Sequence, residues 1–335
     1  MSKKTFLARL LMQPWMFPVW NMRSLKHVSV LAYHRVYPLE PNYPFNDETI
    51  SVTPEQFREQ LTFIKKYFHV TNFLQLVAAE KNNQAIPPNS LIMTFDDGYA
   101  DNFEWMLPII KEFDLTAVVY VSVDYLGTNN PFWFDEIAYL INHTKVKKIS
   151  ICGGQHTLEI TSDNRLQVRK KIGMIARLLA DRERFELMDE VRAQSEVTIN
   201  PDDIVKAKPL NWDEVIGLHS AGIEIGSHSL SHGFLDRMTE AEIKIQVEES
   251  KRILEEKLQA PIVSFSFPNG DFDKRVTEAV RVANYKFAVG YRHAVACFDE
   301  SIRFQIPRIH VETDVSLPLF QANLLLPEIF LKQTN

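Results

Sequence analysis

The sequence predicts an α/β fold built from βα units around parallel strands, and three observations support that prediction. Strand-like and helix-like segments alternate along most of the chain. Several strand-like segments are continuous apolar runs, such as 91–95 (LIMTF) and 116–122 (TAVVYVS), as in parallel strands buried on both faces. Polar residues of catalytic or metal-binding type follow directly after several of these runs. In barrels and in open parallel sheets, that end of the strands binds ligands.

The composition is that of an ordinary globular protein and argues against some classes of function. The 335 residues suffice for one large α/β domain or two smaller ones, and 45% hydrophobic with 24% charged residues is ordinary for a globular protein. A net charge of −6 argues against a nucleic-acid partner, because a phosphate backbone requires a basic surface. Cys152 and Cys297 are too few for a disulfide framework.

Residues 1–26 form a separate N-terminal segment. Residues 1–20 begin with lysines and are mostly apolar, but Arg9 and two prolines interrupt them, so they match neither a signal peptide nor a membrane span. One face of a short amphipathic helix would carry Phe6, Leu7, Leu10, Leu11 and Trp15. Packing of that face on the protein's own body is the simpler interpretation, and peripheral membrane contact through residues 1–20 is the alternative.

The main domain is expected at 27–315, and its first half contains clear element signals. Thr53, Pro54 and Gln56 form a helix start, with an N-cap, a proline in the first turn and a capping-box partner. In chain order we predict a strand at 27–32 before His34, a loop at 38–50, the helix from Thr53, a strand at 69–71, a helix at 73–80, the strand at 91–95, a helix at 102–113 and the strand at 116–122.

The alternation stops between about 124 and 208. This region contains a helix start at 132–136, a hairpin around Cys152 and a charged helical stretch at 165–194. Because no flexible Gly/Ser linker brackets it, we interpret it as an α-rich insertion rather than an independent domain. Its aromatic residues, among them Trp133, belong either to the core or to a wall that stacks on a sugar ring.

Alternation then resumes to the end of the domain. Thr239 and Glu242 form a second capping box at the start of a long helix. The predicted elements are a helix at 212–220, a strand at 223–226, the helix to Leu258, a strand at 262–267, a helix at 274–283 and strands at 286–290 and 304–309, with 316–335 as a C-terminal tail.

Candidate site residues follow the predicted strands: His34, Asp96, Asp97, His228, His232, Asn269, Asp271 and His310. His228 and His232 are four residues apart, so on a helical turn both imidazoles lie on one face and can share a metal ion. Two imidazoles and one carboxylate are typical of a catalytic metal with open positions, and a second aspartate beside it can act as general base. The simpler interpretations are that Asp97 caps the following helix and that His34 is structural.

Three motifs resemble those of the polysaccharide deacetylase family, the NodB-homology domain of carbohydrate esterase family 4. They are TFDDGY at 94–99, HSLSH at 228–232 and FPNG at 267–270. The likeness extends to LAYHRV at 31–36, TPEQFREQL at 53–61 and the long phrase at 212–232, so it covers the chain from about 28 to 311.

The resemblance implies a distorted (β/α) barrel of the NodB-homology type, with about seven parallel strands and the insertion at about 124–208. It also implies a divalent metal and hydrolysis of an N-acetyl, or sometimes O-acetyl, group on a sugar. By motif, the base would be Asp96, the metal ligands Asp97, His228 and His232, the oxyanion donor the backbone N–H of Tyr99, and the general acid His310.

Two departures from the family pattern affect these assignments. Many members carry an arginine before the proline of the third motif, which orients the base, whereas this chain has serine and phenylalanine before Pro268. Asp96 therefore needs another partner, and Arg308 is the candidate. The last motif reads Arg-Ile-His instead of Leu-x-His, so His34 is the reserve for His310. Candidates for substrate contact are His34, Pro268, Asn269 and Trp133.

We therefore predict a metal-dependent carbohydrate deacetylase, a hydrolase of carbon–nitrogen bonds other than peptide bonds. Zn²⁺ is the expected metal, with Co²⁺, Mn²⁺ or Ni²⁺ as alternatives. The expected substrate is an N-acetylated sugar, an oligosaccharide or a lipid- or nucleotide-linked precursor of an envelope polysaccharide, handled in the cytoplasm or at the inner face of the membrane. Two alternatives stay open: hydrolysis of another non-peptide C–N bond, and a catalytically silent glycan-binding protein.

Overall fold

The computed structural model describes residues 3–16, 28–295 and 301–331. Parts of the predicted N-terminal segment and C-terminal tail, together with Cys297, lie outside these ranges. Within them, no helix is both long enough and apolar enough to cross a bilayer.

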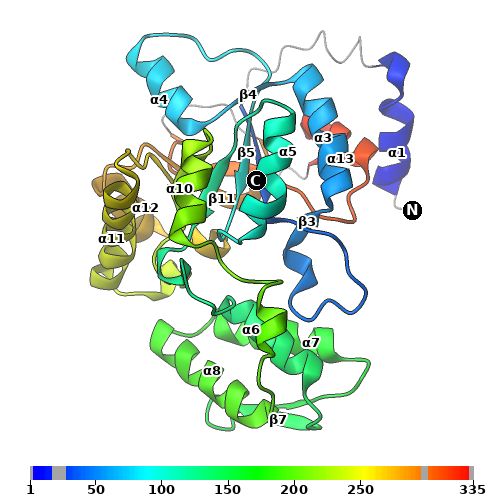
Figure 1. Cartoon of the computed structure of the whole chain (residues 1–335), viewed down its shortest axis with the longest axis vertical. Coiled ribbons are helices and arrows are strands. Elements are labelled where there is room, and N and C mark those ends of the chain that lie inside the picture. Colours follow the sequence, from blue (N-terminus) through cyan, green and yellow to red (C-terminus); the bar gives the residue numbers. More distant parts are fainter. Residues whose placement is uncertain (1–2, 17–27, 296–300, 332–335) are drawn as a thin grey trace.

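Parallel strands close into a barrel (Figure 1). Its seven strands are, in spatial order, β1 (Ser29–Tyr33), β12 (Ile306–His310), β11 (Phe287–His293), β10 (Ser264–Ser266), β9 (Glu224–Ser227), β6 (Val118–Val121) and β5 (Ser90–Phe95). The barrel closes where β5 pairs with β1, with Leu31 aligned to Met93. A further strand, β4 (His69–Thr71), pairs in parallel with the first residues of β5. The predicted barrel of about seven parallel strands is confirmed.

Helices surround the barrel: α3 (Pro54–Tyr67), α4 (Phe73–Lys81), α5 (Leu107–Glu112), α10 (Trp212–Ser220), α11 (Glu240–Leu258) and α12 (Lys274–Val282). The predicted capping box of α3 is present, since Thr53 and Gln56 each accept a hydrogen bond from the other's backbone N–H. The helix predicted at 102–113 begins instead as a π-helical turn, Asn102–Met106, and becomes α-helical only at α5.

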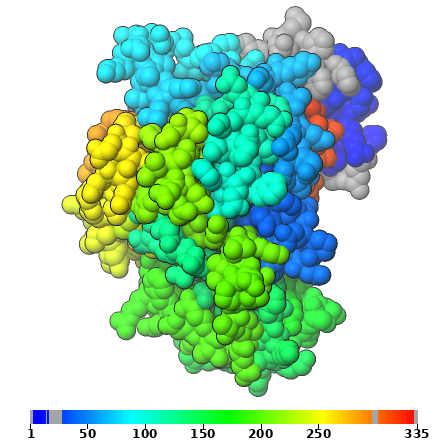
Figure 2. Space-filling model, in the orientation of Figure 1, coloured from blue at the N-terminus to red at the C-terminus, as the bar shows by residue number. Residues whose placement is uncertain are grey.

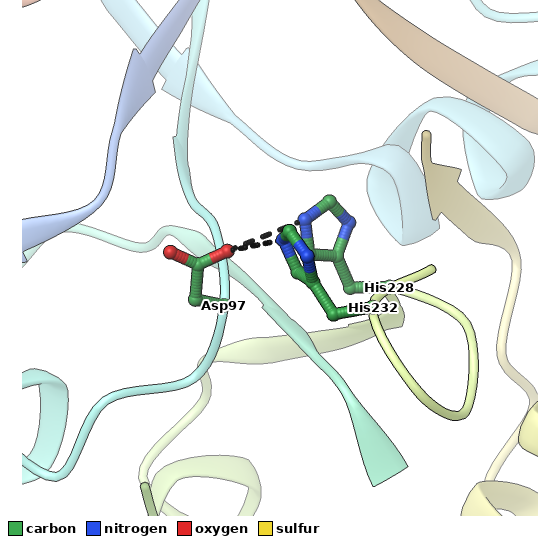
Figure 3. Close-up of side chains that lie close together, drawn as sticks. All are labelled: Asp97, His228 and His232. Atoms are coloured by element: carbon green, nitrogen blue, oxygen red, sulfur yellow. Dashed lines mark hydrogen bonds and ion pairs between the residues drawn. The ribbon is translucent and has the colours of Figure 1, made fainter. Parts of the chain in front are cut away.

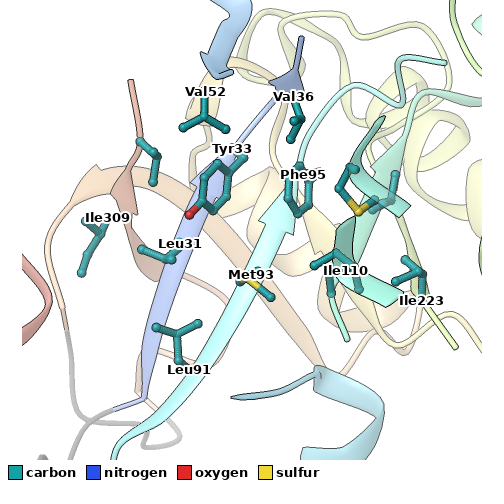
Figure 4. Packing of buried hydrophobic residues seen from close by; sticks show 14 of the residues in the cluster. Leu31, Tyr33, Val36, Val52, Leu91, Met93, Phe95, Ile110, Ile223 and Ile309 are labelled. Atoms are coloured by element: carbon teal, nitrogen blue, oxygen red, sulfur yellow. The ribbon is translucent and has the colours of Figure 1, made fainter. Parts of the chain in front are cut away.

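Side chains alternate between the two faces of the barrel wall. Leu31, Met93 and Val119 share a large apolar cluster with residues of α3, α5 and α11, as Figure 4 shows for part of that cluster. Their strand neighbours Val30 and Ile92 belong to a second cluster with side chains of β6, β11 and β12. This period of two is that of strands buried on both faces, with the second cluster inside the barrel.

A short strand pair that the sequence analysis missed flanks the predicted loop at 38–50. β2 (Arg35–Val36) pairs in parallel with β3 (Ile50–Val52), and a 3₁₀ turn, η2 (Asp47–Thr49), precedes β3. Segments of two and three residues are too short to show a strand pattern in the sequence.

The region at 124–208 contains α6 (Trp133–His143), the antiparallel pair β7 (Lys148–Ile151) and β8 (His156–Glu159), α7 (Arg165–Ala176), α8 (Asp181–Ser195) and α9 (Pro201–Ile204). The hairpin predicted around Cys152 is confirmed. Helices α6, α7 and α8 enclose an apolar cluster of their own, which also receives Phe234 from the segment after β9. Figure 1 shows this unit at one end of the barrel.

The first helix and the last helices of the described chain contact each other, and Figure 1 shows α1 (Lys3–Leu11) and α13 (Leu317–Leu325) on the same side of the barrel. Helix α1, which the turn η1 (Pro14–Met16) follows, lies beside α13, and α13 is followed by α14 (Pro327–Phe330). The stretch assigned to a C-terminal tail therefore contains two helices, and Phe320 and Leu324 of α13 are buried in the large cluster.

Candidate active site

The two aspartates leave β5 through a tight turn. Asp97 and Gly98 both have positive φ angles, +73° and +85°. A Cβ on Gly98 would lie 2.9 Å from Val121 Cγ1, so only glycine combines this backbone conformation with this close approach. The turn places Asp96 and Asp97 side by side at the carboxyl end of the barrel.

The two histidines come from the irregular segment after β9, and the expectation of a helical turn there is wrong. Ser229 and His232 have positive φ angles, +67° and +52°. The Ser229 Oγ accepts the backbone N–H of His232 at 3.2 Å, and carbonyls of this segment accept N–H groups of residues that follow β6. These hydrogen bonds replace those of a helix and still direct both imidazoles inward.

Asp97, His228 and His232 converge on one point (Figure 3). Asp97 Oδ1 lies 3.1 Å from His232 Nε2 and 3.4 Å from His228 Nε2, and all three side chains are buried. Burial alone would raise the pKa of Asp97, but hydrogen bonds with His228 and His232 hold it well below its usual range.

This triad fits a divalent metal. His228 Nδ1 donates to the carbonyl oxygen of Ser266 at 2.7 Å, which directs the Nε2 lone pair of the neutral ring toward Asp97. Lone pairs of two imidazoles and a carboxylate that face one another in a buried site repel unless a cation or proton lies among them. Two nitrogens and one carboxylate oxygen are a donor set that Zn²⁺ prefers.

Asp96 has the partner that the third motif lacks. Arg308 on β12 donates from its two terminal nitrogens to both oxygens of Asp96, at 2.7 Å each, and both side chains are buried. Ser266 supplies a further hydrogen bond to Asp96 at 3.3 Å. Burial would raise the pKa of Asp96, but the charge and hydrogen bonds of Arg308 outweigh it and lower that pKa below its usual value. Asp96 is therefore ionised at neutral pH.

Tyr99 lies in a short antiparallel bridge with the segment before α10. The flanking bonds, from Ala100 N–H to Lys208 O and from Leu210 N–H to Gly98 O, form an antiparallel bridge in which Tyr99 itself is not hydrogen-bonded to the facing segment. In the described part of the chain, the backbone N–H of Tyr99 therefore meets no acceptor. The Tyr99 hydroxyl donates to Asp135 at 2.6 Å, and this hydrogen bond anchors the turn that follows β5.

A cavity of about 350 Å³ opens over these groups. Its wall carries most of the predicted site residues together with several that were not predicted: His34, Asn46, Thr49, Asp96, Asp97, Trp133, Phe134, Arg177, His228, His232, Asn269, Gly270 and Tyr291. Asn269 Nδ2 is buried and has no hydrogen-bond partner among the described residues, so it can donate a hydrogen bond to an oxygen atom of a ligand. Pro268 is buried at the start of the 3₁₀ turn η6 (Pro268–Gly270) and does not line the cavity.

His310 and His34 differ in their access to this cavity. The His310 ring stacks on Tyr291, with centroids 3.6 Å apart, and does not line the cavity. Burial, with the neighbouring charges of His293 and Arg308, lowers the pKa of His310 to about 3. His34 lines the cavity and is half-buried, and its backbone N–H donates to Ser51 Oγ at 2.9 Å.

Two arginine–aspartate pairs near the site were not predicted from the sequence. Arg177, from the insertion, reaches the cavity and pairs with Asp271, so one of the predicted polar residues binds an arginine. Beneath the turn, Arg35 pairs with Asp101 at 2.7 Å, and both are buried. Arg35 follows His34 in the LAYHRV stretch, but only the folded chain brings Arg35 and Asp101 together.

Comparisons with known proteins agree with this geometry. A family model described as polysaccharide deacetylase matches residues 83–288, more than half of the chain. No curated protein sequence matches the chain.

Solved structures share the fold at low sequence identity. The Streptococcus pyogenes deacetylase PplD in complex with acetate superposes with a TM-score of 0.60 at 16% identity, covering 90% of this chain and 99% of that one. A polysaccharide deacetylase from Bacillus cereus gives 0.58 at 14% identity, with 89% and 69% covered. A de-N-acetylase from Aggregatibacter actinomycetemcomitans gives 0.55 at 14% identity, with 89% and 99% covered. On the match of the family model, the chain belongs to the polysaccharide deacetylase family.

Proposed function

We propose that the chain is a metal-dependent hydrolase that removes an acetyl group, N-acetyl by preference, from a sugar in a glycan or glycan precursor. One observation supports this most strongly. An ionised carboxylate, Asp96, lies beside three convergent metal-type ligands in one cavity, and a pure binding module has no need of that carboxylate. The ligands would be Asp97, His228 and His232. A bound Zn²⁺ or similar ion would polarise the acetyl carbonyl and lower the pKa of water to about 7.

In this proposal Asp96 is the general base. Arg308 holds both of its oxygens, so the carboxylate cannot rotate away from the cavity, and its lowered pKa keeps it ready to accept a proton from the attacking water. The backbone N–H of Tyr99 would stabilise the negative charge that develops on the acetyl oxygen as water adds to the carbonyl.

For the proton that the leaving amine requires, we propose His34 rather than His310. A general acid must carry its proton near the working pH and must reach the leaving group. His310 is neutral at pH 7 and stacked behind Tyr291, whereas His34 lines the cavity together with Asp96 and Asp97.

The cavity wall also supports a sugar as the substrate. Trp133 and Phe134 add aromatic surface to the cavity wall, and the unpaired Nδ2 of Asn269 can donate to a sugar oxygen. An N-acetylated monosaccharide, an oligosaccharide and a lipid- or nucleotide-linked precursor all present this chemistry, and a substrate series would separate them.

Acetate release from N-acetylated sugars tests the proposal. Protein loaded with zinc or cobalt should release acetate, chelated protein should not, and Asp96→Asn should lose the activity while its metal content by elemental analysis stays unchanged. Retention of acetate release in Asp96→Asn would remove Asp96 from the role of base. Bound metal without acetate from any substrate would favour the catalytically silent glycan-binding alternative.

A further inference from the structure

Helix α1 has two apolar faces on opposite sides. Ala8 and Met12, the residue after the helix, are 0% and 5% exposed and belong to the large cluster that also contains residues of α13. Phe6 and Leu10, four residues apart, are 61% and 60% exposed. Positions two residues away from Ala8 lie about 200° around a helix from it, so Phe6 and Leu10 point away from the packed face. Packing on the protein's own body thus explains the apolar face with Ala8 and Met12. It does not explain the exposed apolar face with Phe6 and Leu10.

The outward face is held in place by the rest of the molecule. Lys4 Nζ donates to the carbonyl oxygen of Phe330 in α14 at 2.7 Å, and α1 lies along α13. Figure 2 shows α1 at the edge of the molecule, with its outer side uncovered by described residues. Trp15, in the turn after the helix, is 72% exposed, more than any other large apolar side chain in the described ranges. The apolar surface is therefore presented by a fixed helix.

The charged residues of helix α1 are all basic. Helix α1 carries Lys3, Lys4 and Arg9 and no acidic residue, and the first acidic residue of the whole chain is Glu40, although the net charge is −6. Lys3 and Arg9 are exposed beside the outward face. Lys4 of this helix contacts the carbonyl oxygen of Phe330. The acidic residue nearest to Phe330 in the sequence is Glu328 of α14.

We propose that the outward face of α1, formed by Phe6, Leu7, Leu10 and Trp15, docks on the surface of a bilayer that contains anionic lipids. An interfacial helix buries an apolar face among lipid headgroups and acyl chains while basic residues at its flanks contact the anionic headgroups. Tryptophan is favoured at that depth because its ring is apolar and its N–H is polar. Docking would hold the enzyme beside membrane-associated glycans, but the inference does not depend on the proposed deacetylase activity.

Cosedimentation of the full chain with vesicles tests this without any substrate. Binding is expected to phosphatidylcholine vesicles that contain phosphatidylglycerol, with weaker binding to phosphatidylcholine alone and in high salt. The double variant Phe6→Ser, Leu10→Ser should lower the partition coefficient about tenfold or more, because it removes the apolar anchor. The double variant Lys3→Gln, Arg9→Gln should reduce binding to anionic vesicles only.

Phe185→Ser is the matched control, because Phe185 is 55% exposed on α8, in the insertion. It should bind vesicles like the unmodified chain, and all variants should keep the same thermal unfolding midpoint. Failure of the full chain to bind either vesicle would overturn the proposal, as would equal binding by the Phe6 and Leu10 variant. Self-association that this variant abolishes, in the absence of vesicle binding, would assign the face to a second copy of the chain instead.

Discussion

Arg308 and Asp96 are 212 residues apart in the chain and form a buried pair with two hydrogen bonds of 2.7 Å. The pair joins β12 to the end of β5 across the strand between them, β1, and Arg308 also donates to Thr94 and to the carbonyl oxygen of Gly290. A guanidinium matches a carboxylate in this two-bonded geometry, which the single ammonium of lysine cannot reproduce.

Replacing Arg308 by lysine should therefore impair the base and leave the metal ligands intact. We expect kcat to fall roughly 10- to 100-fold with unchanged metal content. The loss of Arg308 lets burial raise the pKa of Asp96, so the acidic limb of the pH–rate profile should move to higher pH. An unchanged profile would contradict the assignment of Asp96 as base.

Removing a ligand of the triad should abolish the response of stability to zinc. In the unmodified chain, zinc at about 100 times its Kd should raise the free energy of unfolding by about 2.7 kcal/mol. His232→Ala should show no such gain, because only two of the three ligands in the described site remain. Differential scanning calorimetry with added zinc or chelator measures this. His69→Ala is the control, because His69 is the exposed first residue of β4, and it should respond to zinc like the unmodified chain.

The two candidate proton donors can be separated by parallel substitutions. His34→Ala should lower kcat by about 100-fold or more, whereas His310→Ala should lower it much less. The loss in His34→Ala should be smaller on an activated amide whose leaving group needs no proton. A larger loss in His310→Ala, with the same dependence on the leaving group, would restore His310 as the general acid.

Glu224, buried in β9, should make stability depend on pH. Burial raises the pKa of Glu224 to about 7 in the folded protein, against 4.5 for the ordinary side chain. Because the folded state binds this proton more tightly than the unfolded state does, the contribution of Glu224 to the free energy of unfolding falls as pH rises from about 4.5 to 7.

Glu224→Gln removes that titration. It should be more stable than the unmodified chain at pH 8 by about 3 kcal/mol, with a smaller difference at pH 5. Urea denaturation at the two pH values measures both. Glu256→Gln, on the exposed side of α11, should change neither value. A constant difference across pH would mean that the substitution acts through hydrogen bonds, since Glu224 accepts from Leu74 N–H and from the Ser264 hydroxyl.

Sequence alone determined the features that depend on neighbours in the chain. The apolar run at 91–95, the capping box at Thr53 and Gln56 and the candidate ligands after two strands were all readable, because each follows from local residue order. The metal-type cluster then required only that parallel strands end at the same edge of the barrel.

Tertiary structure alone decided which distant groups meet. Arg308 was a candidate in the sequence, but its pairing with Asp96 depends on barrel closure between β1 and β5. Pairing of β11 with β12 stacks His310 on Tyr291, whereas His34 lines the cavity, although both histidines follow predicted strands. Local order cannot settle such choices, because the free energy of a buried charge depends on the partners that the folded chain places around it.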